Sequence, residues 1–243
     1  MRRIIVMNTK GGCGKTTIAT NLASYYASRG FKTALFDHDP QGSSSHWLRR
    51  RNDNRAAIFG VTAYQIDTGN ATRAWQLRVP AETERIVIDT PAGIRSNELI
   101  NYLRGVNTVL IPVLPSAIDI VSTTAFIRDL LLVAKVRTTH TRLAIIANRV
   151  RMNTKAFRGL ERFLGSLNIP VVGHLRDTLN YVHAIEKGAG IHEMATPRTQ
   201  NDHLEWEQLT SRIDTSCDRP NSNASAAQLP LSPPLIHPVH LYQ

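Results

Sequence analysis

Six short apolar runs recur along the chain, and stretches with helical periodicity lie between most of them. The runs cover residues 4–7, 33–36, 86–88, 108–111, 143–147 and 170–173. The periodicity predicts helices over residues 16–29, 118–136, 154–167 and 202–213. Continuous apolar runs bounded by helices are typical of strands that are buried on both faces of a parallel sheet. The pattern therefore predicts an α/β fold with a doubly wound, mostly parallel sheet.

The composition changes after residue 213. The last 30 residues hold five of the twelve prolines and only three charged side chains. Such a composition is typical of a segment that does not form a packed core. We therefore predict one folded domain over residues 1–213 and a Pro-rich, disordered tail over residues 214–243.

Several classes of protein are disfavoured by what the sequence contains. No apolar stretch reaches the length of a membrane-spanning helix, and the first apolar run is too short for a signal peptide. The two cysteines, Cys13 and Cys217, cannot build a disulfide framework. These observations predict a cytoplasmic protein.

The charge balance points to an anionic partner. Lysine and arginine number 29 against 19 acidic residues, which gives a formal net charge of +10. An excess of this size favours nucleic acids, phosphate ligands or an anionic membrane surface. A merely basic enzyme remains an alternative on composition alone.

A glycine-rich loop separates the first predicted strand from the first predicted helix. It comprises Lys10, Gly11, Gly12, Cys13, Gly14, Lys15, Thr16 and Thr17. Glycines allow the backbone to approach a ligand closely, and N–H groups at a helix N-terminus bind anions. The context and spacing predict the phosphate loop of a P-loop NTPase. We expect Lys15 to reach the β- and γ-phosphates and the Thr16 hydroxyl to bind Mg²⁺.

Carboxylates follow two further predicted strands, where a parallel sheet faces its ligand. Asp37 and Asp39 come after residues 33–36, and Asp89 comes directly after residues 86–88. An aspartate at the end of an apolar strand is the residue that holds Mg²⁺ in P-loop NTPases. We therefore predict a magnesium site formed by Thr16, Asp37 and Asp89. The following Ala92-Gly93 is expected to respond to the γ-phosphate.

The loop departs from the ordinary phosphate-loop pattern, which would place glycine where Thr9 stands, and it adds Lys10 before the glycines. This two-lysine loop resembles the deviant Walker A motif of the ParA/MinD ATPase superfamily. The segment Asp37-His38-Asp39-Pro40-Gln41-Gly42 is similar to a second motif of that superfamily. The resemblance covers roughly residues 1–212.

The resemblance implies the ligands and the residue roles. The substrate would be ATP with Mg²⁺, and Lys10 would reach the partner's phosphates across a nucleotide-sandwich homodimer. Lys10, Lys15 and Asp39 would carry the catalysis, with Asp39 orienting the attacking water. Intrinsic turnover is expected to be slow, because no glutamate adjoins Asp89. The residues predicted to bind ATP are Lys10, Gly11, Gly12, Cys13, Gly14, Lys15, Thr16, Thr17 and Asn148, the last through adenine.

A DNA-binding surface is expected on the basic residues. The helix at 154–167 places apolar and basic side chains on opposite faces, and Arg176 falls where similar proteins carry a DNA-contacting arginine. The predicted contacts are Arg149, Arg151, Lys155, Arg158, Arg162, Arg176 and Lys187. A rival patch is Arg49-Arg50-Arg51 with Arg55. Contacts of this type bind phosphates without reading the base sequence.

The resemblance implies a small ParA-like ATPase that lacks an N-terminal helix-turn-helix domain. Its ATP-bound dimer would bind non-specific nucleoid DNA and would position or partition a cargo. The cargo would be a protein body such as a carboxysome or chemoreceptor cluster, a plasmid or a chromosome. A ParB-like or cargo-adaptor protein would stimulate hydrolysis, and no membrane partner is expected. The alternatives are a metabolic or assembly enzyme of the CobQ type and a membrane-associated division regulator of the MinD type.

Overall fold

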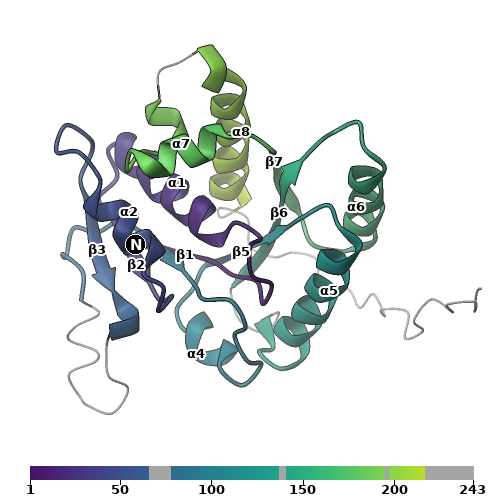
Figure 1. Cartoon of the computed structure of the whole chain (residues 1–243). Coiled ribbons are helices and arrows are strands. Elements are labelled where there is room, and N and C mark those ends of the chain that lie inside the picture. Colours follow the sequence, from purple (N-terminus) through teal and green to yellow (C-terminus); the bar gives the residue numbers. More distant parts are fainter. Residues whose placement is uncertain (66–77, 137–140, 195–196, 217–243) are drawn as a thin grey trace, which may run out of the picture.

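The computed structural model of the protein describes residues 1–65, 78–136, 141–194 and 197–216. A seven-stranded, all-parallel sheet has the strand order β3-β2-β4-β1-β5-β6-β7 (Figure 1). The strands are β1 (Arg2–Val6), β2 (Thr33–Asp37), β3 (Ile58–Thr62), β4 (Arg85–Asp89), β5 (Thr108–Val113), β6 (Arg142–Val150) and β7 (Val171–Arg176). The predicted doubly wound parallel fold is therefore confirmed.

Helices cover both faces of the sheet. They are α1 (Lys15–Ser28), α2 (Ser43–Arg49), α4 (Leu99–Leu103), α5 (Ala117–Leu132), α6 (Lys155–Ser166), α7 (Asn180–Glu186) and α8 (Gln200–Ser216). Short 3-10 turns are η1 (Ala63–Gln65), η3 (Ile191–Glu193) and η4 (Pro197–Thr199). α1, α2, α7 and α8 pack on one face, and α4, α5 and α6 pack on the other (Figure 1). Within the described parts of the chain, no helix is both long and apolar enough to cross a membrane.

The strands inside the sheet have apolar centres because each of their two faces packs into a separate core. In β1, Ile5 packs with the α5 and α6 side, whereas Ile4 and Val6 pack with the α1 and α8 side. Successive side chains of a strand point to opposite faces, so a strand covered on both faces needs an unbroken apolar run. This is the physical basis of the strand pattern seen in the sequence.

The structure contains a strand and three short helices that the sequence pattern did not predict. β3 lies at the edge of the sheet, where Phe59 is exposed, and its centre is Gly60. A Cβ on Gly60 would overlap the end of the Leu48 side chain of α2, so α2 packs closely over this strand. A glycine and an exposed edge hide the strand signal. α2, α4 and α7 have five to seven residues each, too few to show helical periodicity.

The last helix extends slightly beyond the predicted domain boundary. α8 continues to Ser216, and Asp214 accepts hydrogen bonds from Tyr26 and from Arg2 of β1. Residues 217–243 lie outside the described residues. The division into a domain at 1–213 and a tail at 214–243 stays a prediction.

Asp202 anchors the first turn of α8 to the end of β7. Its carboxylate is fully buried and binds the guanidinium of Arg176 and the side-chain amide of Asn180. We expect Asp202→Asn to lower the free energy of unfolding by about 2 kcal/mol, because the Arg176 guanidinium loses its charged acceptor. Chemical denaturation followed by circular dichroism measures this loss. The control Glu207→Gln breaks an ion pair with Arg29 that is 54% exposed on both sides, and it should cost less than about 0.5 kcal/mol. Equal losses in the two variants would contradict the anchoring role.

Candidate nucleotide-binding site

The phosphate-loop segment lies at the topological switch point of the sheet, where the strand order reverses. β1 is central, with β4, β2 and β3 on one side and β5, β6 and β7 on the other. Ligands of open parallel sheets bind at such a point, at the carboxyl ends of the strands. The register pairs Val6 with Asp89 and Asp89 with Asp37. The structure therefore brings the two predicted carboxylates to the base of the loop that follows β1.

The loop needs glycine at position 14. Gly14 has φ +94°, a left-handed conformation that side chains other than glycine rarely adopt, and a Cβ there would overlap Asn148 Nδ2. The Asn148 amide comes from β6 and donates a hydrogen bond of 2.8 Å to the carbonyl of Cys13. The sequence did not predict this contact, which attaches the phosphate loop to β6. The adenine-reading role of Asn148 stays a prediction.

The carbonyl of Lys10 closes the loop. It accepts hydrogen bonds from Lys15 Nζ at 3.0 Å and from Cys13 Sγ at 3.2 Å. Lys15 is buried, and burial also raises the pKa of the Cys13 thiol, which the Lys15 charge only partly offsets. Among the described residues, the Lys15 ammonium has one neutral acceptor, and a buried cation of this kind is well suited to bind an anion. The phosphate-binding role predicted for Lys15 fits this arrangement.

Asn8 positions the start of the loop and was missed by the sequence analysis. It is buried, and its side-chain oxygen accepts the N–H of Lys10 at 3.1 Å. Its amide donates to the carbonyl of Pro112 at 2.9 Å and to the hydroxyl of Thr123 at 3.1 Å. A polar residue directly after a buried strand is the only signal that could have identified it.

A pocket of about 620 Å³ lies over the loop, which is a size that suits a small-molecule ligand. It is lined by Gly11, Gly12, Gly14, Lys15, Thr16, Thr17, Asp39, Pro40, Gln41, Ser43, Pro91 and Ala92. The loop, the predicted water-orienting Asp39 and the segment after β4 thus face one space. Lys10, Cys13, Asp37, Asp89 and Asn148 do not contribute to this lining.

The Asp89 carboxylate is buried at the end of β4. It is 0% exposed, and neither carboxylate oxygen has a hydrogen-bond partner within the described part of the chain. Burial raises its pKa to about 7, although the nearby Thr16 hydroxyl lowers it. An unpartnered buried carboxylate is costly unless a cation binds it. The pair of Asp89 and Thr16 therefore fits a magnesium ion.

Asp37 has a different local environment. One carboxylate oxygen accepts the N–H of Asp39 at 3.1 Å, and the other accepts the N–H of Ser45 at 2.8 Å. Both oxygens thus hold the segment between β2 and α2, and the magnesium-binding role of Asp37 stays a prediction. Among the described residues, no group of three or more His, Cys, Asp and Glu side chains could hold a metal ion by itself. That is compatible with Mg²⁺, which proteins bind through one or two carboxylates and the phosphates of the substrate.

The segment after β4 is joined to the phosphate loop. The Gly93 N–H donates to the carbonyl of Thr9 at 2.9 Å, and the Thr90 hydroxyl donates to the carbonyl of Val6 at 2.9 Å. Gly93 has φ +69°, a conformation that strains any residue with a side chain, although a Cβ there would meet no atom within 4 Å. Through the hydrogen bond between Gly93 and Thr9, a movement of the phosphate loop would also move the Ala92-Gly93 segment.

The basic residues predicted to contact DNA fall into two groups. Lys155, Arg158 and Arg162 are exposed on α6, and the opposite face of this helix is buried, which confirms the predicted amphipathic arrangement. Arg149 and Arg151 precede α6, and both form ion pairs with Asp177 at the end of β7, at 3.3 and 2.7 Å.

Arg176 and Lys187 are placed differently from the α6 group. The Arg176 guanidinium is engaged by Asp202 and by the carbonyl of Arg198, so its role in DNA binding stays a prediction. The carbonyl of Lys187 accepts a hydrogen bond from Arg55, so Lys187 lies beside the rival patch instead of beside α6. In that rival patch, Arg51 is buried in an ion pair with Glu193. The Arg51 side chain is therefore not part of the exposed surface, whereas Arg49 and Arg50 are exposed, and DNA binding by this patch stays a prediction.

Comparisons with known proteins agree with this geometry. The family model described as CbiA, the CobQ/CobB/MinD/ParA nucleotide binding domain, matches residues 4–191. A relative, maintenance of carboxysome distribution protein A from Halothiobacillus neapolitanus, is 28% identical over 205 residues, which is 83% of this chain and 92% of the relative.

Solved structures share the fold. The complex of ATP with an aspartate-to-alanine variant of Cyanothece McdA has a TM-score of 0.66 and 17% identity, covering 88% of this chain and 96% of McdA. A chain of the MinC:MinD cell division complex from Aquifex aeolicus has a TM-score of 0.68 and 17% identity, covering 96% and 99%. Because the family model spans most of the chain, the protein belongs to the CobQ/CobB/MinD/ParA family and is a nucleotide-binding ATPase of the ParA/MinD type.

Proposed function

We propose that this ATPase forms an ATP-bound homodimer that binds non-specific DNA and positions a cargo over the nucleoid. The observation that carries the proposal is the match to a carboxysome-distribution protein along 92% of that protein's length. A cargo that is a protein body, such as a carboxysome, follows most directly from this match. A ParB-like or cargo-adaptor partner stimulates hydrolysis, and the protein acts in the cytoplasm without a membrane partner.

In this proposal, different residues at the pocket bind the phosphates, hold the magnesium ion and orient the attacking water. Backbone N–H groups of Gly11 to Thr17 and the N-terminus of α1 bind the phosphates, and Lys15 stabilises the charge that develops on them. Thr16 and Asp89 would hold the magnesium ion, which neutralises the charge of the β- and γ-phosphates when bound. Asp39 lines the same pocket and orients the attacking water. Catalysis of this kind rests on positioning and electrostatics, so its rate depends on how well these groups are held.

Lys10 supplies the dimer contact in this proposal. Its backbone is fixed by Asn8 and by the two donors to its carbonyl, while its side chain is only partly buried. A fixed backbone with a long cationic side chain at the mouth of the phosphate loop suits a contact with the γ-phosphate of a second copy. Closing two such loops on each other brings two exposed α6 faces into one assembly.

Family membership alone does not separate the positioning ATPases from amide-forming enzymes, because the family model includes CobQ and CobB. The exposed basic face of α6 favours a polyanion partner over a small substrate as the second ligand. A CobQ-type enzyme would bind its substrate without any dependence on DNA. The DNA test below therefore also separates the two functions.

ATP-dependent retention on DNA tests the proposal. We expect the full chain to bind random-sequence duplex DNA with ATP and Mg²⁺ but not with ADP, and affinity should fall steeply with salt. Arg158→Glu should weaken binding about tenfold without affecting the ATP-dependent dimer, because it reverses a charge on the exposed α6 face. Fluorescence anisotropy measures the first effect, and light scattering measures the second. Arg29→Glu, which makes the same charge change at the C-terminal end of α1, is the control.

If ATP leaves DNA affinity unchanged, the proposal fails. Equal losses in Arg158→Glu and Arg29→Glu would instead show that net charge alone governs binding. That result would remove α6 as the DNA-contacting surface.

A further inference from the structure

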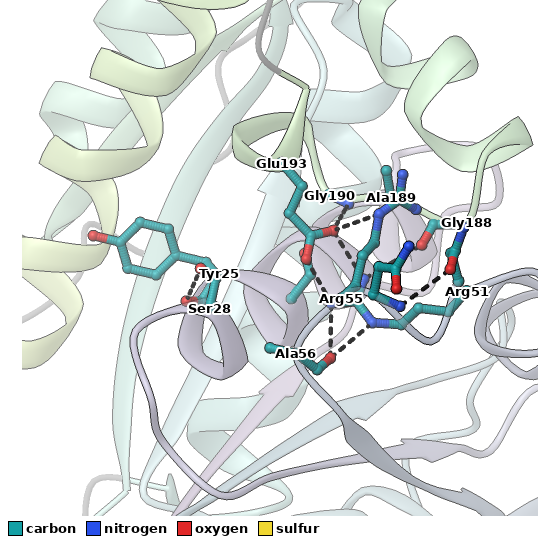
Figure 2. Close-up of polar contacts among 12 residues, drawn as sticks. Tyr25, Ser28, Arg51, Arg55, Ala56, Gly188, Ala189, Gly190 and Glu193 are labelled. Carbon is teal, nitrogen blue, oxygen red and sulfur yellow. Dashed lines mark hydrogen bonds and ion pairs between the residues drawn. The ribbon is translucent and has the colours of Figure 1, made fainter.

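A cluster of polar contacts joins the turn after α2 to the segment between α7 and α8 (Figure 2). We call it the α2 clasp and define it as Arg51, Arg55, Glu193 and the backbone of residues 188–190. Arg51 binds Glu193 with two parallel hydrogen bonds, Nη1 to Oε2 at 2.8 Å and Nη2 to Oε1 at 2.5 Å. The Arg51 side chain is only 5% exposed and that of Glu193 only 10%.

Arg51 and Glu193 also form hydrogen bonds to the neighbouring backbone. Arg51 donates from Nε and Nη2 to the carbonyl of Ala56, at 3.1 and 2.9 Å, and from Nη1 to the carbonyl of Gly188. Glu193 accepts the N–H of Gly190 at 2.8 Å (Figure 2). A buried ion pair contributes little net stability because of its desolvation, but a two-pronged pair defines direction and distance closely. The geometry therefore suits a positioning element better than a general source of stability.

In the α2 clasp, the backbone at Gly188 packs directly against the backbone that follows α2. Gly188 has φ +58°, and a Cβ there would lie 2.5 Å from the backbone carbonyl of Arg50. The Trp47 indole of α2 donates to the carbonyl of Ala189 at 3.1 Å, and the Arg51 guanidinium lies over its ring. Such close backbone packing leaves α2 little freedom to slide.

The same segment is attached to the phosphate-loop helix. The Ile191 N–H donates to Asn21 Oδ1 at 2.7 Å, and Asn21 Nδ2 donates to the carbonyl of Thr17 at 2.7 Å. A Cβ on Gly190 would overlap the hydroxyl of Ser24 on α1. Residues 188–191 thus support α1 and α2 together.

The other end of α2 reaches the pocket. The N–H of Ser45 holds the Asp37 carboxylate, and Asp39 lies between Asp37 and the helix. With only seven residues, α2 is about 10 Å long, so a displacement at Arg51 reaches Ser45.

We infer that Arg51 and Glu193 are positioning residues for ATP hydrolysis: the α2 clasp holds α2 so that Asp37 and Asp39 stay aligned with the phosphate loop. Neither residue lines the nucleotide pocket, so they act through α2. The inference rests on the ATPase activity of the family and not on DNA binding. It predicts a change in turnover with little change in nucleotide affinity, because the phosphate loop keeps its own hydrogen bonds.

Glu193→Gln tests the inference in the full chain. We expect kcat for ATP to fall about tenfold while the Kd for a fluorescent ATP analogue changes by less than about threefold. Measurements are made well below the unfolding midpoint of each variant, in the absence of DNA. Asp214→Asn is the matched control, since it breaks an ion pair between α8 and Arg2 of β1 and should leave kcat unchanged.

The double variant Arg51→Met/Glu193→Leu separates positioning from stability. Replacing both partners of a buried pair by apolar side chains is close to neutral for folding, so the unfolding midpoint should recover while kcat stays low. A kcat that recovers together with the midpoint would overturn the inference. A normal kcat in Glu193→Gln, or an equal fall in Asp214→Asn, would overturn it as well. None of these readouts involves DNA, so failure here is distinct from failure of the proposed function.

Discussion

Gly14→Ala is expected to abolish ATP binding and turnover. The backbone at this position has φ +94°, and the added methyl group would overlap the Asn148 amide that holds the Cys13 carbonyl. Relieving the overlap requires the phosphate loop to move away from β6, which disperses the N–H groups that bind the phosphates. We expect nucleotide affinity to fall by about 100-fold or more, since strain of 1–3 kcal/mol adds to the lost contacts. Titration with a fluorescent ATP analogue measures the loss.

Gly159→Ala is the matched control for this prediction. Gly159 lies within α6, has no positive φ, and no atom lies within 4 Å of an added Cβ. The control should bind ATP normally and should gain about 0.5–1 kcal/mol in the free energy of unfolding, because alanine is the better helix former. Normal nucleotide affinity in Gly14→Ala would show that the loop tolerates a side chain and would contradict the proposed close contact.

Asp39→Ala is expected to stop hydrolysis while ATP still binds. Asp39 lines the pocket opposite the phosphate loop, and its carboxylate accepts the N–H of Gln41 at 3.0 Å. Removing a group that orients the attacking water should lower kcat by about 100-fold, the usual scale for such a catalytic group. The phosphate contacts of the loop remain, so the Kd for ATP should change little.

Rapid-quench measurement of ATP cleavage and nucleotide titration together test this prediction. Asp53→Ala removes an exposed carboxylate from the turn after α2 and serves as the control, with unchanged kcat expected. Undiminished cleavage in Asp39→Ala would assign the water-orienting role to another group. Parallel losses of kcat and affinity would instead indicate that Asp39 shapes the pocket.

Residues that carry local signals could be predicted from the sequence. Gly14 and Lys15 lie at the start of α1, and Asp89 ends β4 beside Val6 of β1, as the order of strand, loop and helix in the sequence predicts. The parallel sheet could also be predicted from the sequence, because burial of a strand on both faces requires a continuous apolar run. Of the strands in the described residues, only β3 was not predicted, since its edge position and Gly60 remove the apolar signal.

Residues whose role depends on a distant partner could not be predicted. Asn148 holds the phosphate loop from 135 positions away, and Arg51 binds Glu193 across 142 positions. In the sequence, Arg51 is the third arginine of a run that reads as an exposed basic patch. Its burial follows only from the packing of α2 against the segment after α7.

The sequence by itself thus determined the doubly wound sheet, the phosphate loop and the carboxylates at the ends of β2 and β4, because strand burial and loop chemistry are local properties of the chain. Only the tertiary structure decided which polar side chains hold those parts in place. Hydrogen bonds and buried ion pairs form between groups far apart along the chain, and their partners are selected by the packing of helices on the sheet. The basic surface shows both contributions, since the exposed face of α6 follows from helical periodicity, whereas the burial of Arg51 follows from the fold.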